Sequence, residues 1–305
     1  MFRRGTRAFW REGRSVDGFS FIDFLHGYVY ARWPYLYIGL ATGERRLPRV
    51  LRPMVRAVSW LFLQRAGAIE RTVAARDSFA DKYHGKVVPP KLARQLVTLE
   101  KPVELRGIER VIPYGQALDL VMKEPDHIAV LECPCRAVRE NPCLPLDVCL
   151  IVGEPFTRLV LDHHPRKARR ITQDEAIGIL EAEHARGHVH HAFFKDAMLG
   201  RFYAICNCCS CCCGAMQAWR SGTPMLASSG YIARVTEEAC VGCATCAEAC
   251  PFGAIAVEDG RAHVDESACM GCEVCVSACP HGALSLARDE NGSEPLAVRE
   301  LIEGL

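Results

Sequence analysis

The first 132 residues of this 305-residue chain contain no cysteine, although the whole chain contains 18. A secreted protein held together by disulfides would normally be much shorter and would begin with an apolar signal segment. Here Met1-Phe2-Arg3-Arg4 leads into charged residues without such a segment, and no uncharged apolar run approaches the roughly 20 residues that span a bilayer. The sequence therefore predicts a reducing, cytoplasmic setting in which the thiols are metal ligands.

Motifs that bind nucleotides are missing as well. The sequence contains neither the glycine pattern of dinucleotide-binding folds, G-x-G-x-x-G, nor the phosphate-binding loop G-x4-G-K-[ST]. It carries no helix-turn-helix signal that would support binding to nucleic acid. A redox role would therefore need electrons that arrive from, and leave to, other proteins or a cofactor without a recognisable motif.

Acidic residues are scarce at the start of the chain and basic residues at its end, although the net charge is only +1. Residues 1–110 hold 21 Lys and Arg against 10 Asp and Glu, a net of +11, whereas residues 231–305 hold 4 against 13, a net of −9. This separation favours two regions that face different partners, and attraction between the two ends is the alternative. The acidic region suits a basic patch on a redox partner. The basic region suits a second partner or a peripheral contact with the inner membrane.

One N-terminal segment is a candidate for such a contact. Residues 50–63 form an amphipathic pattern, with Arg49, Arg52 and Arg56 on one side and apolar side chains near the other. This arginine face would lie on anionic lipid or would be the solvated face of a packed helix, and spacing alone leaves both open.

The strongest pattern is an internal repeat near the C-terminus. The run C-x2-C-x2-C-x3-C-P begins at Cys240 and recurs 29 residues later at Cys269. After each run an alternating stretch, at 254–257 and 283–286, predicts a short strand. Two copies of one loop–helix–strand unit are therefore expected.

This run is the one that holds cubane iron–sulfur clusters in bacterial ferredoxins. Thiolates at i, i+3 and i+6 wrap one face of a cubane, and the fourth cysteine of each run binds the other cluster. Residues 231–287 resemble the two-cluster bacterial ferredoxins at all eight ligand positions, which implies two [4Fe-4S] clusters. Structural zinc, which typically uses separated C-x2-C pairs, is the weaker alternative. The implied ligand sets are Cys240, Cys243, Cys246 and Cys279 for one cluster, and Cys269, Cys272, Cys275 and Cys250 for the other.

A second group of ten cysteines lies upstream. The segments C-P-C-R and C-N-C-C-S-C-C-C, followed by a ferredoxin-type domain, resemble a family of multi-cluster iron–sulfur proteins of anaerobic bacteria and archaea over residues 111–287. This resemblance implies an architecture and a place in anaerobic metabolism more than a particular reaction. The ten candidate metal ligands are Cys133, Cys135, Cys143, Cys149, Cys206, Cys208, Cys209, Cys211, Cys212 and Cys213.

The spacing of these cysteines supports metal binding but leaves the number of centres open. Cys206, Cys209 and Cys212 repeat the cubane-wrapping interval, and Cys208 and Cys211 form an overlapping pair. Because adjacent cysteines cannot easily all face one centre, the run serves two centres or mixes ligands with spare thiols. Ten thiols suffice for one or two further iron–sulfur clusters. Zinc in part of the site and a low-complexity run without ligands are the alternatives.

Several polar residues nearby are weaker candidates. His188, His190 and His191 could supply a ligand or a proton relay, although histidines near a helix end are commonly solvated or hydrogen-bonded. Arg136 and Arg139 lie close in sequence to two thiolates, where positive charge would favour a reduced cluster. Plain surface positions fit these arginines equally well.

The patterns together predict an α+β protein of three regions. Residues 1–110 form a mainly helical, basic region, residues 111–230 a Cys-rich α/β domain, and residues 231–305 a two-cluster ferredoxin domain. Capping-box spacing from Thr172 to Glu175 supports one helix in the middle domain. The elements expected there and just before it are strands at 103–106, 127–132 and 202–205 and helices at 115–123 and 173–186.

The function that these features favour is electron transfer between redox protein partners. Clusters whose irons are all bound by thiolate have no open coordination site, so they exchange electrons without binding substrate. The alternative is a low-potential reductase subunit whose active iron–sulfur or thiol centre lies in the Cys-rich domain. A redox sensor is a third and weaker hypothesis.

Overall fold

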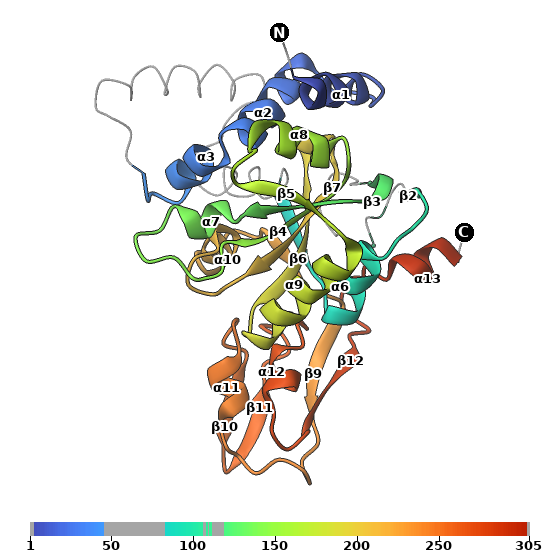
Figure 1. The fold of residues 1–305 in the computed structure, drawn as a ribbon. Helices are drawn as coiled ribbons and strands as arrows, with labels where there is room; N and C mark the ends of the chain where they lie inside the picture. Colours follow the sequence, from blue (N-terminus) through green and yellow to red (C-terminus); the bar gives the residue numbers. More distant parts are fainter. Residues whose placement is uncertain (1–2, 46–82, 106–107, 109, 112–118, 304–305) are drawn as a thin grey trace, which may run out of the picture.

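A single large sheet organises most of the chain (Figure 1). The computed structural model describes residues 3–45, 83–105, 108, 110–111 and 119–303. Within these ranges the sheet has eight strands in the order β2-β3-β4-β7-β6-β1-β8, with β5 paired to β3, and only β1 and β8 pair in parallel. The strands are β1 (Tyr83–Val87), β2 (Val103–Leu105), β3 (Leu120–Glu132), β4 (Asp147–Glu154), β5 (Ala168–Ile171), β6 (Val189–Lys195), β7 (Arg201–Cys208) and β8 (Leu226–Ala227).

Strands β3 and β4 are buried on both faces because each carries a continuous apolar run. Residues 128–131 of β3 and 148–152 of β4 are all buried, a pattern typical of strands covered on two sides. In the register, Leu131 lies opposite Cys149, and the backbone N–H of Cys133 donates to the carbonyl oxygen of Leu146. Cys133, which directly follows β3, is thereby held next to β4.

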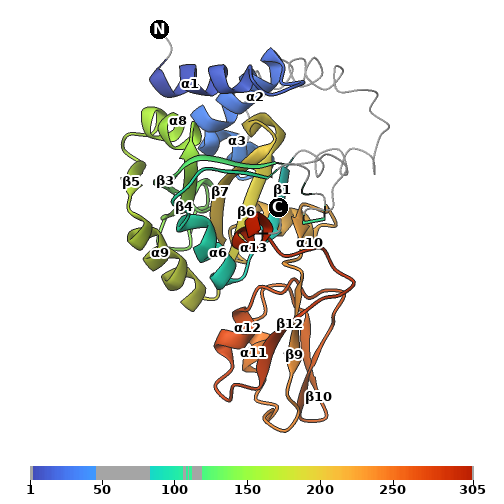
Figure 2. The ribbon, with the colours of Figure 1, turned by 90° about the vertical axis from the view of Figure 1, so that its right-hand side faces the viewer.

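Helices cover both faces of the sheet (Figures 1 and 2). One core includes Phe9, Phe24, Phe156 and Met216, which come from four helices on the first face. These helices are α1 (Arg4–Gly13), α2 (Phe21–Arg32), α8 (Phe156–His163) and α10 (Gly214–Arg220), with α3 (Pro34–Ala41), α7 (Pro134–Ala137) and the 3-10 helix Asp196–Met198 near them. A second core, on the opposite face, holds α6 (Pro90–Val97), α9 (Gln173–Ala185) and α13 (Val298–Glu303).

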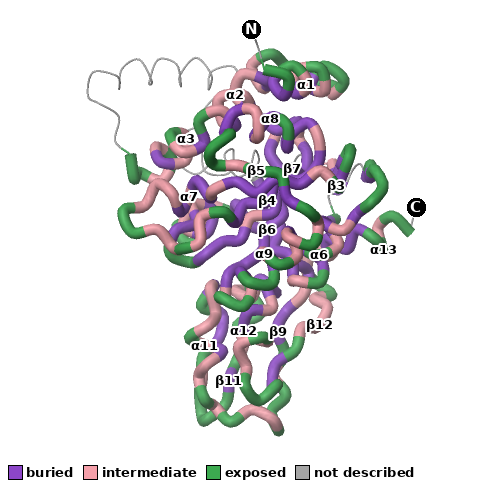
Figure 3. Tube along the Cα trace, in the orientation of Figure 1, coloured by how far each residue is buried: buried purple, intermediate pink, exposed green. Residues whose placement is uncertain are grey.

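Residues 231–288 form a smaller lobe, drawn below the sheet in Figures 1 and 2. Figure 3 shows that the large sheet is mostly buried, whereas the lobe is largely intermediate or exposed. Two loop–helix–strand units follow one another in it, α11 before β10 and α12 before β12, as the repeat predicts. The elements of this lobe are β9 (Tyr231–Val235), α11 (Thr245–Ala249), β10 (Ile255–Glu258), β11 (Arg261–Val264), α12 (Val274–Ala278) and β12 (Leu284–Arg288), with β9 paired to β12 and β10 to β11.

The mixed helix and sheet content agrees with the predicted α+β class. The strand predictions at 103–106, 127–132 and 202–205 fall on β2, β3 and β7. The helix predicted at 173–186 is α9, and the Thr172 hydroxyl accepts a hydrogen bond from the N–H of Glu175 at 3.2 Å. That bond satisfies one of the free amides at the helix start.

The strands β1, β2 and β3 bear on two sequence expectations, a helix at 115–123 and a domain boundary at residue 110. The helix predicted at 115–123 is wrong over its described part, because Leu120, Val121 and Met122 pair with β2 as a strand. A short apolar run fits either element, and pairing with a distant strand decided it. Strands β1 and β2 precede residue 110 but pair with strands that follow it, so the large sheet crosses the boundary expected there.

Among the described residues, no helix combines the length and the apolar character needed to cross a bilayer. The amphipathic segment 50–63, with its arginine face, lies outside the residues that the structure describes.

Candidate metal centres

The eight cysteines of the smaller lobe lie in two groups of four. Each group takes three cysteines from one run and the fourth from the other, which is the grouping that the repeat predicts. We call one the near group, which is Cys250, Cys269, Cys272 and Cys275, and the other the far group, which is Cys240, Cys243, Cys246 and Cys279. The near group contacts the core of the large sheet through Cys250 and Cys272, whereas Cys243 of the far group is exposed.

Backbone amides point at four of these sulfurs. Hydrogen bonds to sulfur stabilise thiolate ligands and tune the potential of the clusters that they bind. The donors occupy equivalent places in the two repeats, so the donor set fits two clusters of the same kind. The pairs are Ala254 to Cys250 at 3.3 Å, Ala283 to Cys279 at 3.4 Å, Ala262 to Cys240 at 3.5 Å and Ala233 to Cys269 at 3.4 Å.

Two glycines let each cysteine loop pass close to another backbone segment. Gly242 has φ +65° and Gly271 has φ +60°, a region that side chains other than hydrogen disfavour. A Cβ at Gly242 would lie 2.2 Å from the carbonyl oxygen of Gly260, and one at Gly271 would lie 2.1 Å from that of Tyr231. The first cysteines of each run are therefore positioned by a contact that only glycine permits.

Six of the ten upstream cysteines lie together on the first face of the large sheet. We call them the buried group. They come from the end of β3, α7, β4, β7 and the residue before α10, and all line a cavity of about 80 Å³. Each thiol contacts the next one in a row, and the spatial order of the row is Cys206, Cys149, Cys133, Cys135, Cys213 and Cys208. The sulfurs of Cys213 and Cys208 are 3.1 Å apart.

Crowding and burial oppose deprotonation of Cys133, Cys135, Cys149, Cys208 and Cys213. The neighbouring Cys135 thiol, together with burial, raises the pKa of Cys133 to about 12. A hydrogen bond from Cys213 favours the Cys208 thiolate, but burial and the neighbouring cysteines together outweigh it and raise the pKa of Cys208 to about 12. Bound metal cations would reverse this balance, because they stabilise thiolates directly. The all-sulfur donor set of the buried group thus fits an iron–sulfur cluster.

The other four upstream cysteines form a second set nearer the surface, which we call the outer group. It consists of Cys143, Cys209, Cys211 and Cys212. The sulfurs of Cys143, Cys209 and Cys211 all lie within 4.8 Å of one another. Cys212 approaches this trio from one side, with its sulfur 3.4 Å from that of Cys211. Cys211 is exposed, whereas Cys209 and Cys212 are buried.

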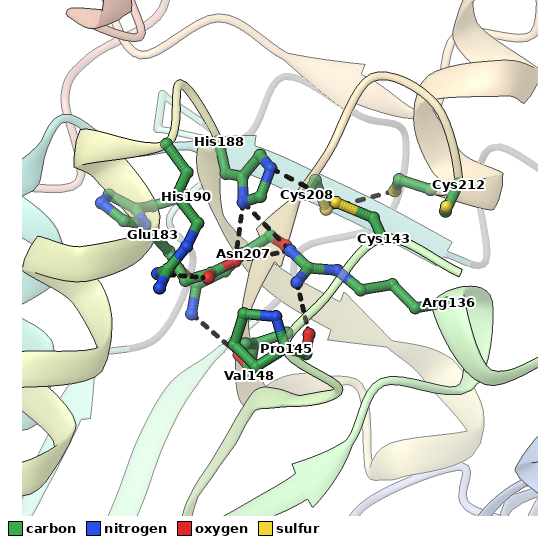
Figure 4. A network of polar contacts seen from close by, with 12 residues as sticks. Arg136, Cys143, Pro145, Val148, Glu183, His188, His190, Asn207, Cys208 and Cys212 are labelled. Atoms are coloured by element: carbon green, nitrogen blue, oxygen red, sulfur yellow. Dashed lines mark hydrogen bonds and ion pairs between the residues drawn. The ribbon is translucent and has the colours of Figure 1, made fainter. Parts of the chain in front are cut away.

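A buried polar network lies behind the outer group (Figure 4). Arg136 is 1 % exposed, and its guanidinium donates to the carboxylate of Glu183 and to the carbonyl oxygens of Asn207 and Pro145. Burial alone would raise the pKa of Glu183, but hydrogen bonds from His188 and Arg136 lower it below its ordinary value. Glu183 is therefore an anion that accepts hydrogen bonds from both His188 and Arg136.

His188 connects this network to the outer group. Its Nδ1 lies 2.7 Å from Oε2 of Glu183 and 3.1 Å from a guanidinium nitrogen of Arg136. Because the carboxylate can only accept and makes the shorter contact, we assign the proton to Nδ1, which then donates to Glu183. Its Nε2 lies 3.7 Å from the sulfur of Cys143. Figure 4 shows the ring between Glu183 and Cys143. The carboxylate thus fixes the ring so that the lone pair of Nε2 faces the cysteines.

A cavity of about 1150 Å³ separates the outer group from the near group. Cys209 and Cys211 line it from the side of the large sheet, and Cys250 lines it from the smaller lobe. Next to it, the rings of Trp219 and Phe252 meet edge to face with centroids 5.1 Å apart. The cavity therefore lies between two sets of cysteines, and the lining residues Cys211 and Cys250 are 39 positions apart in the sequence.

The structure separates some residues that spacing had grouped. Cys206 belongs to the buried group and Cys212 to the outer group, because residues two apart on strand β7 share a face and Cys206 therefore aligns with Cys208. His190 lies away from the cysteines, and its Nδ1 donates a hydrogen bond to Oδ1 of Asn207 at 2.6 Å.

Two of the weaker candidates, Arg136 and Arg139, lie close to the upstream cysteines and are not simple surface residues. Arg136 is buried, so the surface interpretation is wrong for it. Arg139 is bonded to the carboxylate of Glu44 and to the carbonyl oxygen of Cys212, which anchors the loop of the outer group. Glu183 was not singled out from the sequence, and its place on the helix face directed at Arg136 and His188 could not be read from helical spacing alone.

Comparison with known proteins identifies one part of the chain. Residues 233–286 match the family model of the 4Fe-4S dicluster domain. No curated protein matches the chain. The smaller lobe is therefore a ferredoxin-like iron–sulfur region with a general role in electron transfer.

Proposed function

We propose that this protein relays single electrons between redox protein partners and that its Cys-rich domain holds at least one iron–sulfur cluster in addition to the two of the dicluster domain. The far and near groups would each hold one [4Fe-4S] cluster, and the buried group would hold the further one. Clusters bound wholly by thiolates supply reversible one-electron chemistry without an open site for substrate.

The observation that carries the proposal is the position of the near group. Its residues Cys250 and Cys272 share a core with Cys133, Cys149 and Cys208 of the buried group. A dicluster domain that served only as a free carrier would not need to pack its second cysteine group against the core that also contains the buried group. The far group faces outward through the exposed Cys243, where a partner could dock.

Charge supports protein partners at both ends. The region 231–305 has a net charge of −9, which suits docking on a basic patch. The region 1–110 has a net charge of +11 and would face a second partner or an anionic membrane surface.

A low-potential reductase subunit is the second candidate, and one observation favours it. The cavity of about 1150 Å³ is large enough to admit a small molecule, and Cys209, Cys211 and Cys250 line it. In that case the dicluster domain would supply electrons to a substrate held there.

Iron analysis of the full-length protein, purified without oxygen, tests the proposal. Iron should exceed about eight per chain, since each cubane adds four. Joint replacement of Cys149 and Cys208 by serine should remove the excess and leave the electron paramagnetic resonance of the dicluster domain unchanged. A Cys212→Ser variant, outside the buried group, is the matched control and should keep all the iron.

Reduction assays separate the two candidates. A relay should be reduced by dithionite or by a partner flavoprotein, but not by NADH or NADPH alone. Rapid bleaching by either nicotinamide, in a preparation free of other reductases, would favour the enzyme. A count of eight irons with ten titratable thiols would contradict both a further cluster and the relay through it.

A further inference from the structure

The outer group has a different geometry from the cysteines that bind cubanes. In a cubane each thiolate binds a different iron, so the ligand sulfurs stand apart around the cluster. Around a single tetrahedral metal with bonds of about 2.3 Å, they approach to about 3.8 Å. Cys143, Cys209 and Cys211 lie within 4.8 Å of one another, whereas no three of the eight cysteines in the smaller lobe, all of them described, form such a set.

A fourth donor lies beside this trio, next to Cys143. The Nε2 atom of His188 lies 3.7 Å from the sulfur of Cys143, close to the roughly 3.5 Å expected for nitrogen and sulfur on one tetrahedral zinc ion. The other ring nitrogen donates to Glu183, and Glu183 is held by Arg136. A carboxylate behind a histidine is the usual support of a metal-binding imidazole, since it fixes the tautomer and the ring orientation.

We propose that Cys143, Cys209, Cys211 and His188 bind one Zn²⁺ ion, as a centre separate from every iron–sulfur cluster of this protein. Four protein ligands make a closed site of the structural type. Its ligands come from the loop before β4, the loop after β7 and the start of β6, so the ion would clamp these segments together. The loop after β7 begins directly after Cys208 and ends at Cys213, so the clamp would also position two thiols of the buried group.

Cys212 is the competing fourth ligand, and the structure favours His188 over it. Each of the two candidates approaches one member of the trio and lies outside the mutually close set: His188 is near Cys143, and Cys212 is near Cys211. The difference between them is the Glu183 carboxylate, which directs the lone pair of His188 at Cys143 and has no equivalent at Cys212.

Zinc and iron are measured together in the full-length protein, purified without oxygen and passed over a weak chelator. About one zinc per chain should remain, and zinc X-ray absorption should show three sulfurs at about 2.3 Å and one nitrogen at about 2.0 to 2.1 Å. Cys211→Ser should remove this zinc and leave the iron unchanged. Cys212→Ser, the adjacent matched control, should keep both. Glu183→Gln should weaken zinc binding by about 10- to 100-fold in a competition with a chromophoric chelator.

A His188→Cys variant tests whether the position itself binds zinc, because it should keep the ion with four sulfur ligands. Retained zinc would show that metal loss in the other variants does not come from misfolding. Loss of about four irons in Cys211→Ser, without zinc in the wild type, would mean that a cubane occupies the outer group. Zinc that depends on Cys212 and not on His188 would assign the wrong fourth ligand. Either result overturns this proposal and leaves the iron count of the buried group, which tests the relay, unaffected.

Discussion

Substitution of Gly242 by alanine tests whether close backbone contact positions the far group. Gly242 has φ +65°, and the added Cβ would lie 2.2 Å from the carbonyl oxygen of Gly260. Gly253 is a matched control, because it has φ +68° but nothing within 4 Å of an added Cβ. Left-handed backbone costs about 1 to 2 kcal/mol at either position. Only Gly242→Ala adds an overpacking cost of about 1 to 3 kcal/mol.

The two variants should therefore differ by about 1 to 3 kcal/mol, or about 5- to 150-fold in the population of the correctly formed loop. Gly242→Ala should lose iron from the far group, measured as iron per chain and as loss of one of the two interacting cluster signals in electron paramagnetic resonance. Gly253→Ala should keep both. Equal iron loss in the two variants would show that backbone conformation, and not the contact with Gly260, decides how this loop forms.

Three further predictions concern the large sheet and its contact with the smaller lobe. Arg136→Met should lower the free energy of unfolding by about 3 to 5 kcal/mol, because the Glu183 carboxylate would stay buried without the buried guanidinium that pairs with it; a surface-like loss below 1 kcal/mol in denaturant titration would contradict the network. Lys86 is fully buried, and burial lowers its pKa from 10.5 to about 7. Between these pH values the unfolded chain holds a proton that the folded chain has released, so stability rises with pH. The advantage of Lys86→Met over the wild type should shrink by about 1.4 kcal/mol per pH unit from pH 7 to 9, and a constant difference would refute the assignment. Trp219→Ala should increase amide hydrogen exchange around Phe252 while iron is retained, and unchanged exchange would show that this ring contact does not hold the lobe.

The ligand arrangement of the smaller lobe could be predicted from the sequence because its information is local. Within one run, the spacing places three cysteines in one short loop. Because the two runs are equivalent, the repeat predicts that the fourth cysteine of each run joins the three of the other run. The cysteines of the far and near groups lie together as this reasoning requires. The strands that follow each run could be predicted for the same reason, since alternation is a property of neighbouring residues.

The division of the ten upstream cysteines was decided by the tertiary structure. Spacing suggests Cys206, Cys209 and Cys212 as one set. On strand β7, however, side chains alternate with a period of two, so Cys206 shares a face with Cys208, and the strand ends before Cys209. Cys143 and His188 meet the run only because β4, β6 and β7 lie side by side in the sheet.

Burial of Arg136 depends in the same way on residues far along the chain. Its partners Glu183 and Asn207 are 47 and 71 residues away, and no local pattern could indicate that they surround it. The sequence by itself therefore determined which cysteines of the C-terminal repeat lie together, because their pattern repeats within a short stretch of chain. Only the packing of distant strands decided which of the remaining thiols lie together, because contacts between such strands leave no periodic trace in the sequence.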